Sequence, residues 1–159
     1  MRKERGITLI ALVITIILIL ILAGIAGYEG IKLIQQSNLQ TINANMLLIQ
    51  AKAQTLAEKA EFSGDKENNL KGEKVDNIAS EEPLIKAGIT TGEYYKWDAT
   101  TLEENGLSGV SVKNGEVYYV NYQVGEVADV EVVISSGYKH VDGNVYYKLS
   151  DIKNLSISD

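Results

Sequence analysis

The chain has 159 residues, 45% of them hydrophobic, which excludes a wholly disordered protein. It has no cysteine and a single histidine, His140, which excludes a disulfide scaffold, a thiolate zinc site, a catalytic thiol and a histidine metal cluster. Lys and Arg number 15 against 21 Asp and Glu, for a net charge of −6. This acidic balance argues against direct binding of nucleic acid.

The charge is unevenly distributed along the chain. Residues 1–5 are mostly basic, residues 6–28 carry no charge, and the remainder is acidic. The 20 residues 7–26 are almost all apolar and match the length of one helical membrane span of ~30 Å at ~1.5 Å per residue. A basic end before such a span predicts a cytoplasmic N-terminus.

Three interpretations of this apolar segment compete. The first is a secretory signal cut after Ala26, with Gly24 and Ala26 as the small residues before the cut. The segment is longer than the apolar core of ~7–15 residues that such signals have. The second is a permanent signal anchor, and the third depends on the residues at the junction between the basic end and the apolar segment.

The junction reads Arg5-Gly6-Ile7-Thr8-Leu9-Ile10, and with residues 2–26 it resembles the leader junction of type IV pilins and pseudopilins. In that family a prepilin peptidase cuts the leader after glycine and the new N-terminus is methylated. The resemblance implies a cut between Gly6 and Ile7 and methylation of Ile7. It also implies that subunits assemble through a helix that includes Ile7, Thr8, Leu9, Ile10, Ala11, Leu12, Ile14, Ile17 and Gly24.

One position departs from the family pattern. The family usually has Glu at the fifth mature position, where it meets the N-terminal amine of a neighbouring subunit, whereas this chain has Ala11. An ionised group in lipid costs ~2.5–3.5 kcal/mol at the helix centre unless it is partnered, so Ala11 favours insertion and removes that contact. Some minor pilins and many pilin-like proteins of Gram-positive bacteria resemble this variant.

The resemblance implies a structural subunit and no enzyme, with no catalytic site, cofactor or metal. The expected partners are a prepilin peptidase, the membrane before assembly, and other pilin subunits in a homo- or hetero-oligomeric filament. The protein would then lie at the cell surface, in a filament for motility, adhesion, DNA uptake or secretion. The alternative is a single-pass, membrane-anchored extracytoplasmic binding domain that does not polymerise.

The chain divides into a leader (1–6), a transmembrane or filament-core helix (7–27) and an amphipathic helix (28–62). The last of these carries apolar residues spaced alternately by three and four, which predicts one buried stripe. The stripe either packs on the chain's own domain or forms a coiled-coil seam, and Leu47 and Leu48 widen it. Its residues are Leu39, Ile42, Met46, Ile49, Ala53, Leu56 and Ala60.

The helix is predicted to stop at Ser63 and Gly64, followed by a connecting segment over residues 63–93. We expect an exposed loop as far as Asn77 and then a short helix capped by Ser80 and ended by Gly88. A second short helix is expected at 100–105, capped by Asp98, Thr100 or Thr101 and ended by Gly106.

Residues 94–159 predict an antiparallel sheet, so the expected fold class is α+β, with the long helix covering one sheet face. The four expected strands are 116–122, 126–134, 138–141 and 145–149, with an Asp142-Gly143 turn between the last two. A three-residue turn at 123–125, with Gly125 left-handed, joins the first two. It places Tyr118, Val120 and Tyr122 on one face with Ala128, Val130 and Val132, and Asp129 and Glu131 on the other.

No residues in the sheet region carry recognisable chemistry. His140 is expected to be exposed on a strand. The Glu81/Glu82 and Glu103/Glu104 pairs diverge by about 100° on a helix and form no acid–base dyad. The turn at Asp142 lacks the spaced ligands of a calcium loop. Adjacent tyrosines at 94/95, 118/119 and 146/147 should alternate between core and surface.

Overall fold

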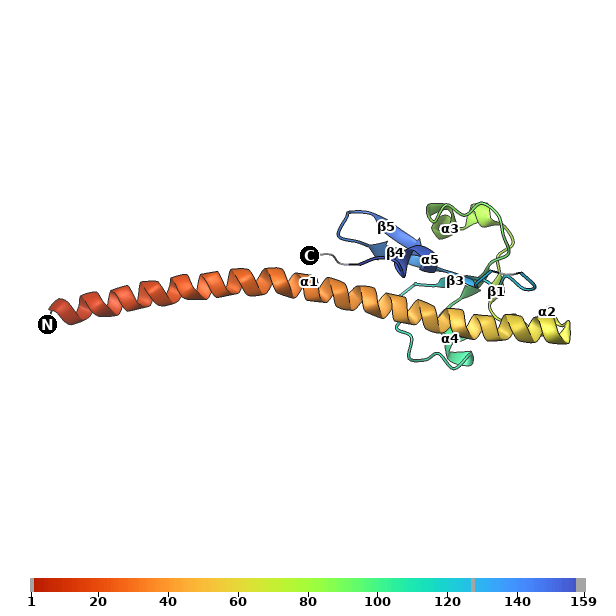
Figure 1. The fold of residues 1–159 in the computed structure, drawn as a ribbon, viewed down its shortest axis with the longest axis horizontal. Coiled ribbons are helices and arrows are strands. Elements are labelled where there is room, and N and C mark those ends of the chain that lie inside the picture. Colours follow the sequence, from red (N-terminus) through yellow and green to blue (C-terminus); the bar gives the residue numbers. More distant parts are fainter. Residues whose placement is uncertain (1, 127, 157–159) are drawn as a thin grey trace. The chain divides into compact units, whose positions relative to one another are not determined.

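In the computed structural model, residues 2–126 and 128–156 are described, without the side chains of residues 2–5, 25, 26 and 28. The fold is α+β, as predicted, with a long N-terminal helix packed on an antiparallel sheet (Figure 1). Two compact units are separated at Asn38/Leu39. The elements are α1 (Arg2–Ser63), α2 (Lys66–Asn69), β1 (Glu73–Lys74), η1 (Ile78–Ser80), α3 (Glu82–Lys86), β2 (Tyr95–Trp97), α4 (Ala99–Glu104), β3 (Tyr118–Asn121), β4 (Glu131–Lys139), β5 (Val145–Lys148) and α5 (Leu149–Ile152).

The predicted apolar stripe of α1 is confirmed as a core element of the second unit. Six of its seven residues are buried and Ile42 is half-buried. They share one hydrophobic cluster with Trp97 and Val132 of the sheet, so the stripe packs on the chain's own domain. Leu47 and Leu48 do not widen it, because both are exposed, whereas Ala57, further along the helix, is buried as well.

The sheet has five strands in the order β1-β2-β3-β4-β5, all antiparallel, where about four were expected. The short strands β1 and β2 were not predicted. The expected strands 126–134 and 138–141 are one strand, β4, whose pairing with β5 shifts between Val133 and Tyr138. Gly137 has φ +67 at this irregularity, a conformation that costs other residues ~1–2 kcal/mol, and it lets the strand continue through the bulge.

The predicted faces of β3 and β4 are confirmed, but the turn between them is wrong. Val120 lies opposite Val132 and Tyr118 opposite Ile134, so these side chains share the α1 face. The connection covers 122–130 instead of the expected three residues, and Ala128 lies in it, exposed. The longer connection brings β-branched residues opposite the β3 core residues, which favours pairing.

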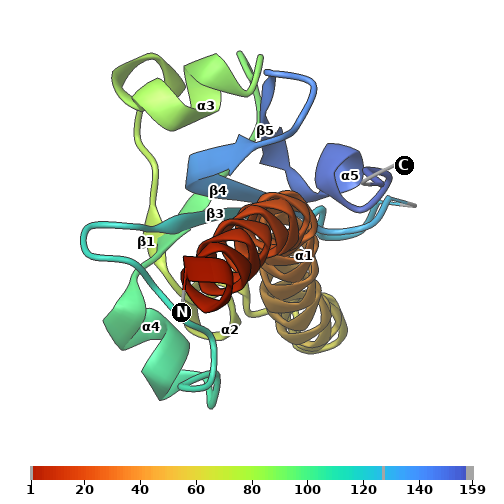
Figure 2. The ribbon, with the colours of Figure 1, turned by 90° about the vertical axis from the view of Figure 1, so that its left-hand side faces the viewer.

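Both faces of the sheet are covered, where one was expected. Figure 2 shows the sheet between the α1 segment of the second unit and α3. On the α3 side, Leu84, Tyr94, Tyr119 and Val133 form a second core cluster. The expected alternation of adjacent tyrosines between core and surface is therefore wrong, since Tyr118 and Tyr119 are both buried.

The short helices lie close to their predicted positions. Asp98 caps α4 by accepting a hydrogen bond from the Thr101 amide, while α3 begins at Glu82, with Glu81 rather than Ser80 as its N-cap. The stretch expected to be an exposed loop after α1 contains α2 and β1, because Asp65 caps a helical turn. Gly125 has the positive φ predicted for it, and Gly64, Gly88 and Gly106, which were predicted to end helices, have positive φ as well.

His140 is buried, with 9% of its surface exposed, which contradicts the expected exposed strand position. Its ring lies 6.0 Å from that of Tyr138 and 6.1 Å from that of Tyr146, measured between centroids. The predicted hairpin itself is confirmed, with Lys139 opposite Val145 around the Asp142-Gly143 turn. The imidazole is buried between the two tyrosine rings. The position of His140 beside a turn gave no indication of this burial.

Candidate assembly helix

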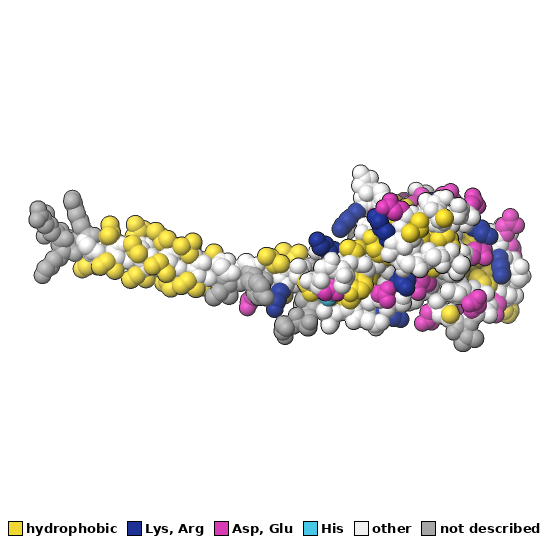
Figure 3. Space-filling view, turned by 90° about the horizontal axis from the view of Figure 1, so that it is seen from above, with side chains coloured by type: hydrophobic (Ala, Val, Ile, Leu, Met, Phe, Trp, Pro, Cys, Tyr) yellow, Lys and Arg dark blue, Asp and Glu magenta, His cyan; other side chains and the backbone are white. Residues whose placement is uncertain are grey.

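The first unit presents apolar side chains on all sides of α1. Every residue from 6 to 24 is exposed, including 69% of Ile7 and 66% of Leu22. Figure 3 shows this stretch as a band of hydrophobic side chains without charge. α1 thus contains one stretch long and apolar enough to span a membrane, with none of that stretch buried in the described structure.

The helical repeat sorts the predicted assembly residues onto distinct faces. Ile7, Ile10, Ile14 and Ile17 follow each other at intervals of three, four and three, so they form one isoleucine ridge along α1. Leu9 and Leu12 lie on other faces. All the predicted residues therefore lie on one helix, but they do not converge on one surface.

A second face of the same helix is formed by small side chains, and the composition of the segment alone did not reveal it. Thr8, Ala11 and Thr15 are also spaced by three and four, so their short side chains lie in line. Small residues on such a line let two helices approach closely in lipid or in a bundle. Thr15 was not among the predicted assembly residues, and the three–four spacing of small residues is the signal that identifies it.

The polar group of Thr15 is satisfied within the helix. Its Oγ1 donates a hydrogen bond to the Ala11 carbonyl oxygen, with 2.7 Å between the two oxygens. A hydroxyl bonded in this way can enter lipid without the cost of an unpaired polar group. Ala11, whose carbonyl oxygen accepts this bond, adds no charge to the face.

The proposed leader junction lies within the helix. Gly6 and Ile7 are both helical residues of α1, so the Gly6–Ile7 bond is part of a regular turn. A Cβ at Gly6 would meet nothing within 4 Å. Met1, the side chains of residues 2–5 and that of Ala26 lie outside the described part of the chain.

No family model, no curated protein and no solved structure matches this chain. Its functional assignment therefore rests on the junction motif, the apolar helix and the fold of the second unit.

Proposed function

We propose that this chain is a structural subunit of a type IV pilus-like filament, made as a membrane-inserted precursor and cut between Gly6 and Ile7. The observation that carries the proposal is the uncharged helical stretch of residues 7–24, exposed on every side directly after a basic end that closes in glycine. Such a surface needs lipid or other apolar helices around it. A retained helix satisfies this need first in the membrane and then in the filament.

Processing requires the first turn of α1 to open. A peptidase cleaves an extended backbone, whereas the Gly6–Ile7 bond is helical. Glycine lowers helix stability by about 1 kcal/mol relative to alanine, so Gly6 makes local unwinding easier at the cut. Prepilin peptidase is the proposed partner in this step, and methylation of the Ile7 amine follows it.

Assembly is assigned to α1, with the small face of Thr8, Ala11 and Thr15 as the place of closest helix approach. The isoleucine ridge supplies apolar contact around it. Ala11 substitutes close packing for the charge pairing that a carboxylate would provide. The proposed partners are further copies of this chain or related subunits.

Mass spectrometry of the protein from its host tests the processing step. The expected N-terminus is a methylated Ile7. An intact Met1 contradicts the cut, and a chain that starts at Gly27 indicates a secreted domain instead. Gly6→Val should block maturation and Gly30→Val should not, although a side chain at either position meets nothing within 4 Å.

A second experiment separates a filament subunit from a plain membrane anchor. Ala11→Leu and Val13→Leu both add apolar bulk to the span, so both variants should insert. Overpacking a close helix contact costs ~1–3 kcal/mol, so Ala11→Leu should lower the amount of filament sheared from cells about fivefold or more. Val13→Leu should leave the yield unchanged. Equal behaviour of the two variants would favour an anchor that does not polymerise.

A further inference from the structure

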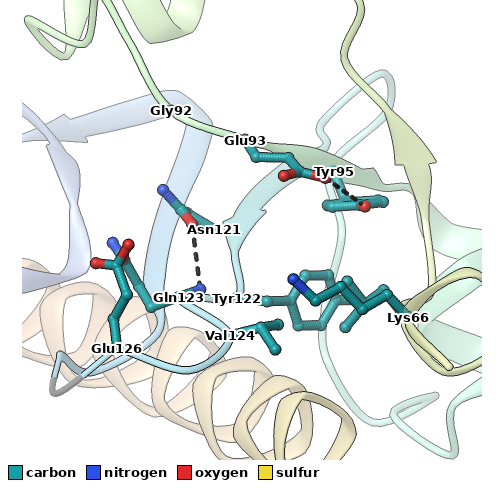
Figure 4. Close-up of a pocket in the computed structure, with 10 residues that line it drawn as sticks. Lys66, Gly92, Glu93, Tyr95, Asn121, Tyr122, Gln123, Val124 and Glu126 are labelled. Carbon is teal, nitrogen blue, oxygen red and sulfur yellow. Dashed lines mark hydrogen bonds between the residues drawn. The ribbon is translucent and has the colours of Figure 1, made fainter. Parts of the chain in front are cut away.

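The second unit contains a polar pocket of about 300 Å³ that is separate from the assembly helix. It lies between α2, the segment leading into β2, and the end of β3 with the connection that follows (Figure 4). Lys66 extends into it from one side, and Gln123 and Glu126 lie at the other. A volume of this size is at the lower end of the range of small-molecule sites.

One wall of the pocket depends on a glycine. Gly92 has φ +121, and a Cβ there would lie 3.0 Å from Cε2 of Tyr94 and 3.1 Å from Nδ2 of Asn121. The Asn121 side chain is held in place because its Oδ1 accepts a hydrogen bond from the Gln123 amide at 3.2 Å. A larger residue at position 92 would push against the side-chain amide of Asn121. The shape of this wall of the pocket therefore depends on Gly92.

The opposite wall is rigid and aromatic. The rings of Tyr95 and Tyr122 meet edge to face, with centroids 5.1 Å apart. The Tyr122 hydroxyl donates to the Lys71 carbonyl oxygen and accepts from Nε1 of Trp97 at 3.1 Å. These bonds hold the ring in one orientation, so a ligand would not have to order it.

Gln123 also bears on function through its backbone. Its φ of +51 is in the left-handed region, and it is the one non-glycine residue with positive φ in the described structure. Such a conformation costs ~1–2 kcal/mol in an L-residue, and conformations of this kind occur preferentially at functional sites. This strained residue is one of those that line the pocket.

The charges of the lining indicate the class of ligand. Lys66 and Glu126 oppose each other across the pocket, and the charge of Glu93 is offset by Lys74, whose Nζ lies 3.0 Å from its Oε1. With Glu93 offset in this way, the remaining charges of the lining, Lys66 and Glu126, balance each other, so the lining favours a neutral ligand over an anion or a cation. An apolar ligand would offer no hydrogen bond to the Lys66 ammonium or the Glu126 carboxylate.

We propose that this pocket binds a neutral saccharide. Each sugar hydroxyl both donates and accepts a hydrogen bond, which matches an ammonium, a carboxylate and an amide arranged around one space. The apolar face of a sugar ring suits the half-buried ring of Tyr95, which the buried ring of Tyr122 supports from behind. The proposal is independent of the filament, because it concerns residues of the second unit alone.

The test uses the full chain in a detergent without a sugar headgroup, titrated with glucose, galactose, mannose and N-acetylglucosamine. Trp97 is the sole tryptophan and is bonded to the pocket residue Tyr122, so its fluorescence reports on the site. Calorimetry gives a second readout of the same titration. We expect saturable binding of at least one sugar with a Kd in the millimolar range or below.

Variants locate the site. Gln123→Gly removes the amide and relieves the backbone, and Glu126→Ala removes the carboxylate; each should weaken binding roughly fivefold to tenfold. Glu103→Ala, on α4 and outside the pocket, should leave the Kd unchanged. Absence of saturable binding of all four sugars by both readouts overturns the proposal. Equal binding by all variants, or tighter binding of acetate or free lysine than of any sugar, overturns it as well.

Discussion

The hydroxyl of Tyr119 donates a hydrogen bond to Oε2 of Glu81, with 2.6 Å between the oxygens, on the sheet face away from α1. The other carboxylate oxygen of Glu81 lies 2.6 Å from Nζ of Lys96. Tyr119 is in β3, Lys96 in β2 and Glu81 caps α3, so three elements meet at one half-buried carboxylate. This cluster holds α3, which covers the sheet face away from α1, against β2 and β3.

Tyr119→Phe should lower the free energy of unfolding by ~1–2 kcal/mol, because it removes a hydrogen bond to a charged group in a partly buried position. Denaturant unfolding of the full chain in detergent measures this. Tyr147→Phe is the matched control on a half-buried tyrosine of β5 and should change stability by less than ~0.5 kcal/mol. Equal effects would mean that the Tyr119 hydroxyl contributes nothing to docking α3.

Stability should fall in acid in part through Glu81. Burial disfavours its charged form, but hydrogen bonds from Lys96 and Tyr119 outweigh burial and lower its pKa. A carboxyl with a lowered folded pKa stabilises the fold above its ordinary pKa, and this contribution is lost as the pH falls through the lowered pKa. Glu81→Gln should therefore lose less stability than the wild type between neutral pH and acid pH, measured by urea unfolding at each pH.

Glu131 should contribute with the opposite sign. Burial raises its pKa despite hydrogen bonds from Ser150, so the folded state holds this proton more tightly than the unfolded state. Its charged form then opposes folding above the raised pKa, and the penalty disappears as the pH falls. Glu131→Gln should be as stable as the wild type or more stable at neutral pH, and any advantage should shrink in acid. A loss of stability at neutral pH would show that the Ser150 contact outweighs burial.

Leu48 and Ile49, neighbours in α1, should contribute very differently to the free energy of unfolding. Ile49 is completely buried against the sheet, whereas Leu48 is 51% exposed. Ile49→Ala should cost ~2–5 kcal/mol of unfolding free energy through lost burial and a cavity. Leu48→Ala should cost less than ~1 kcal/mol. Thermal unfolding of the two variants side by side measures the difference, and similar midpoints would contradict the packing of α1.

Substitutions at two glycines with positive φ, Gly137 and Gly143, should distinguish the cost of backbone strain from the cost of steric overlap. A Cβ at Gly137 would lie 2.5 Å from Cγ1 of Val145 and 2.8 Å from Cε1 of Tyr147, whereas one at Gly143 would meet nothing within 4 Å. Gly143→Ala should cost only the ~1–2 kcal/mol of a left-handed L-residue. Gly137→Ala adds overpacking of ~1–3 kcal/mol, so its unfolding midpoint in denaturant should be lower than that of Gly143→Ala.

The parts of the fold that sequence analysis missed share a physical cause. The strands β1 and β2 are two and three residues long and carry no periodic signal, so they are strands only because β2 pairs with β3 and β1 pairs with β2. The polar pocket likewise joins Lys66, Glu93 and Gln123, which lie far apart along the chain and come to line one space only when α2 docks beside the sheet. No local pattern brings such residues together.

Local order along the chain was enough to predict the apolar span, the stripe from Leu39 to Ala60, the end of α1 at Ser63 and the faces of β3 and β4. Each of these follows from the helical repeat, from strand alternation or from the backbone preference of one residue, all of which act over a few positions. Tertiary packing alone decided that both sheet faces are covered, that His140 is buried and that β4 is continuous. These outcomes depend on which segment, distant along the chain, packs against each surface. Hydrophobic burial is non-directional, so the apolar pattern of one segment does not specify its packing partner.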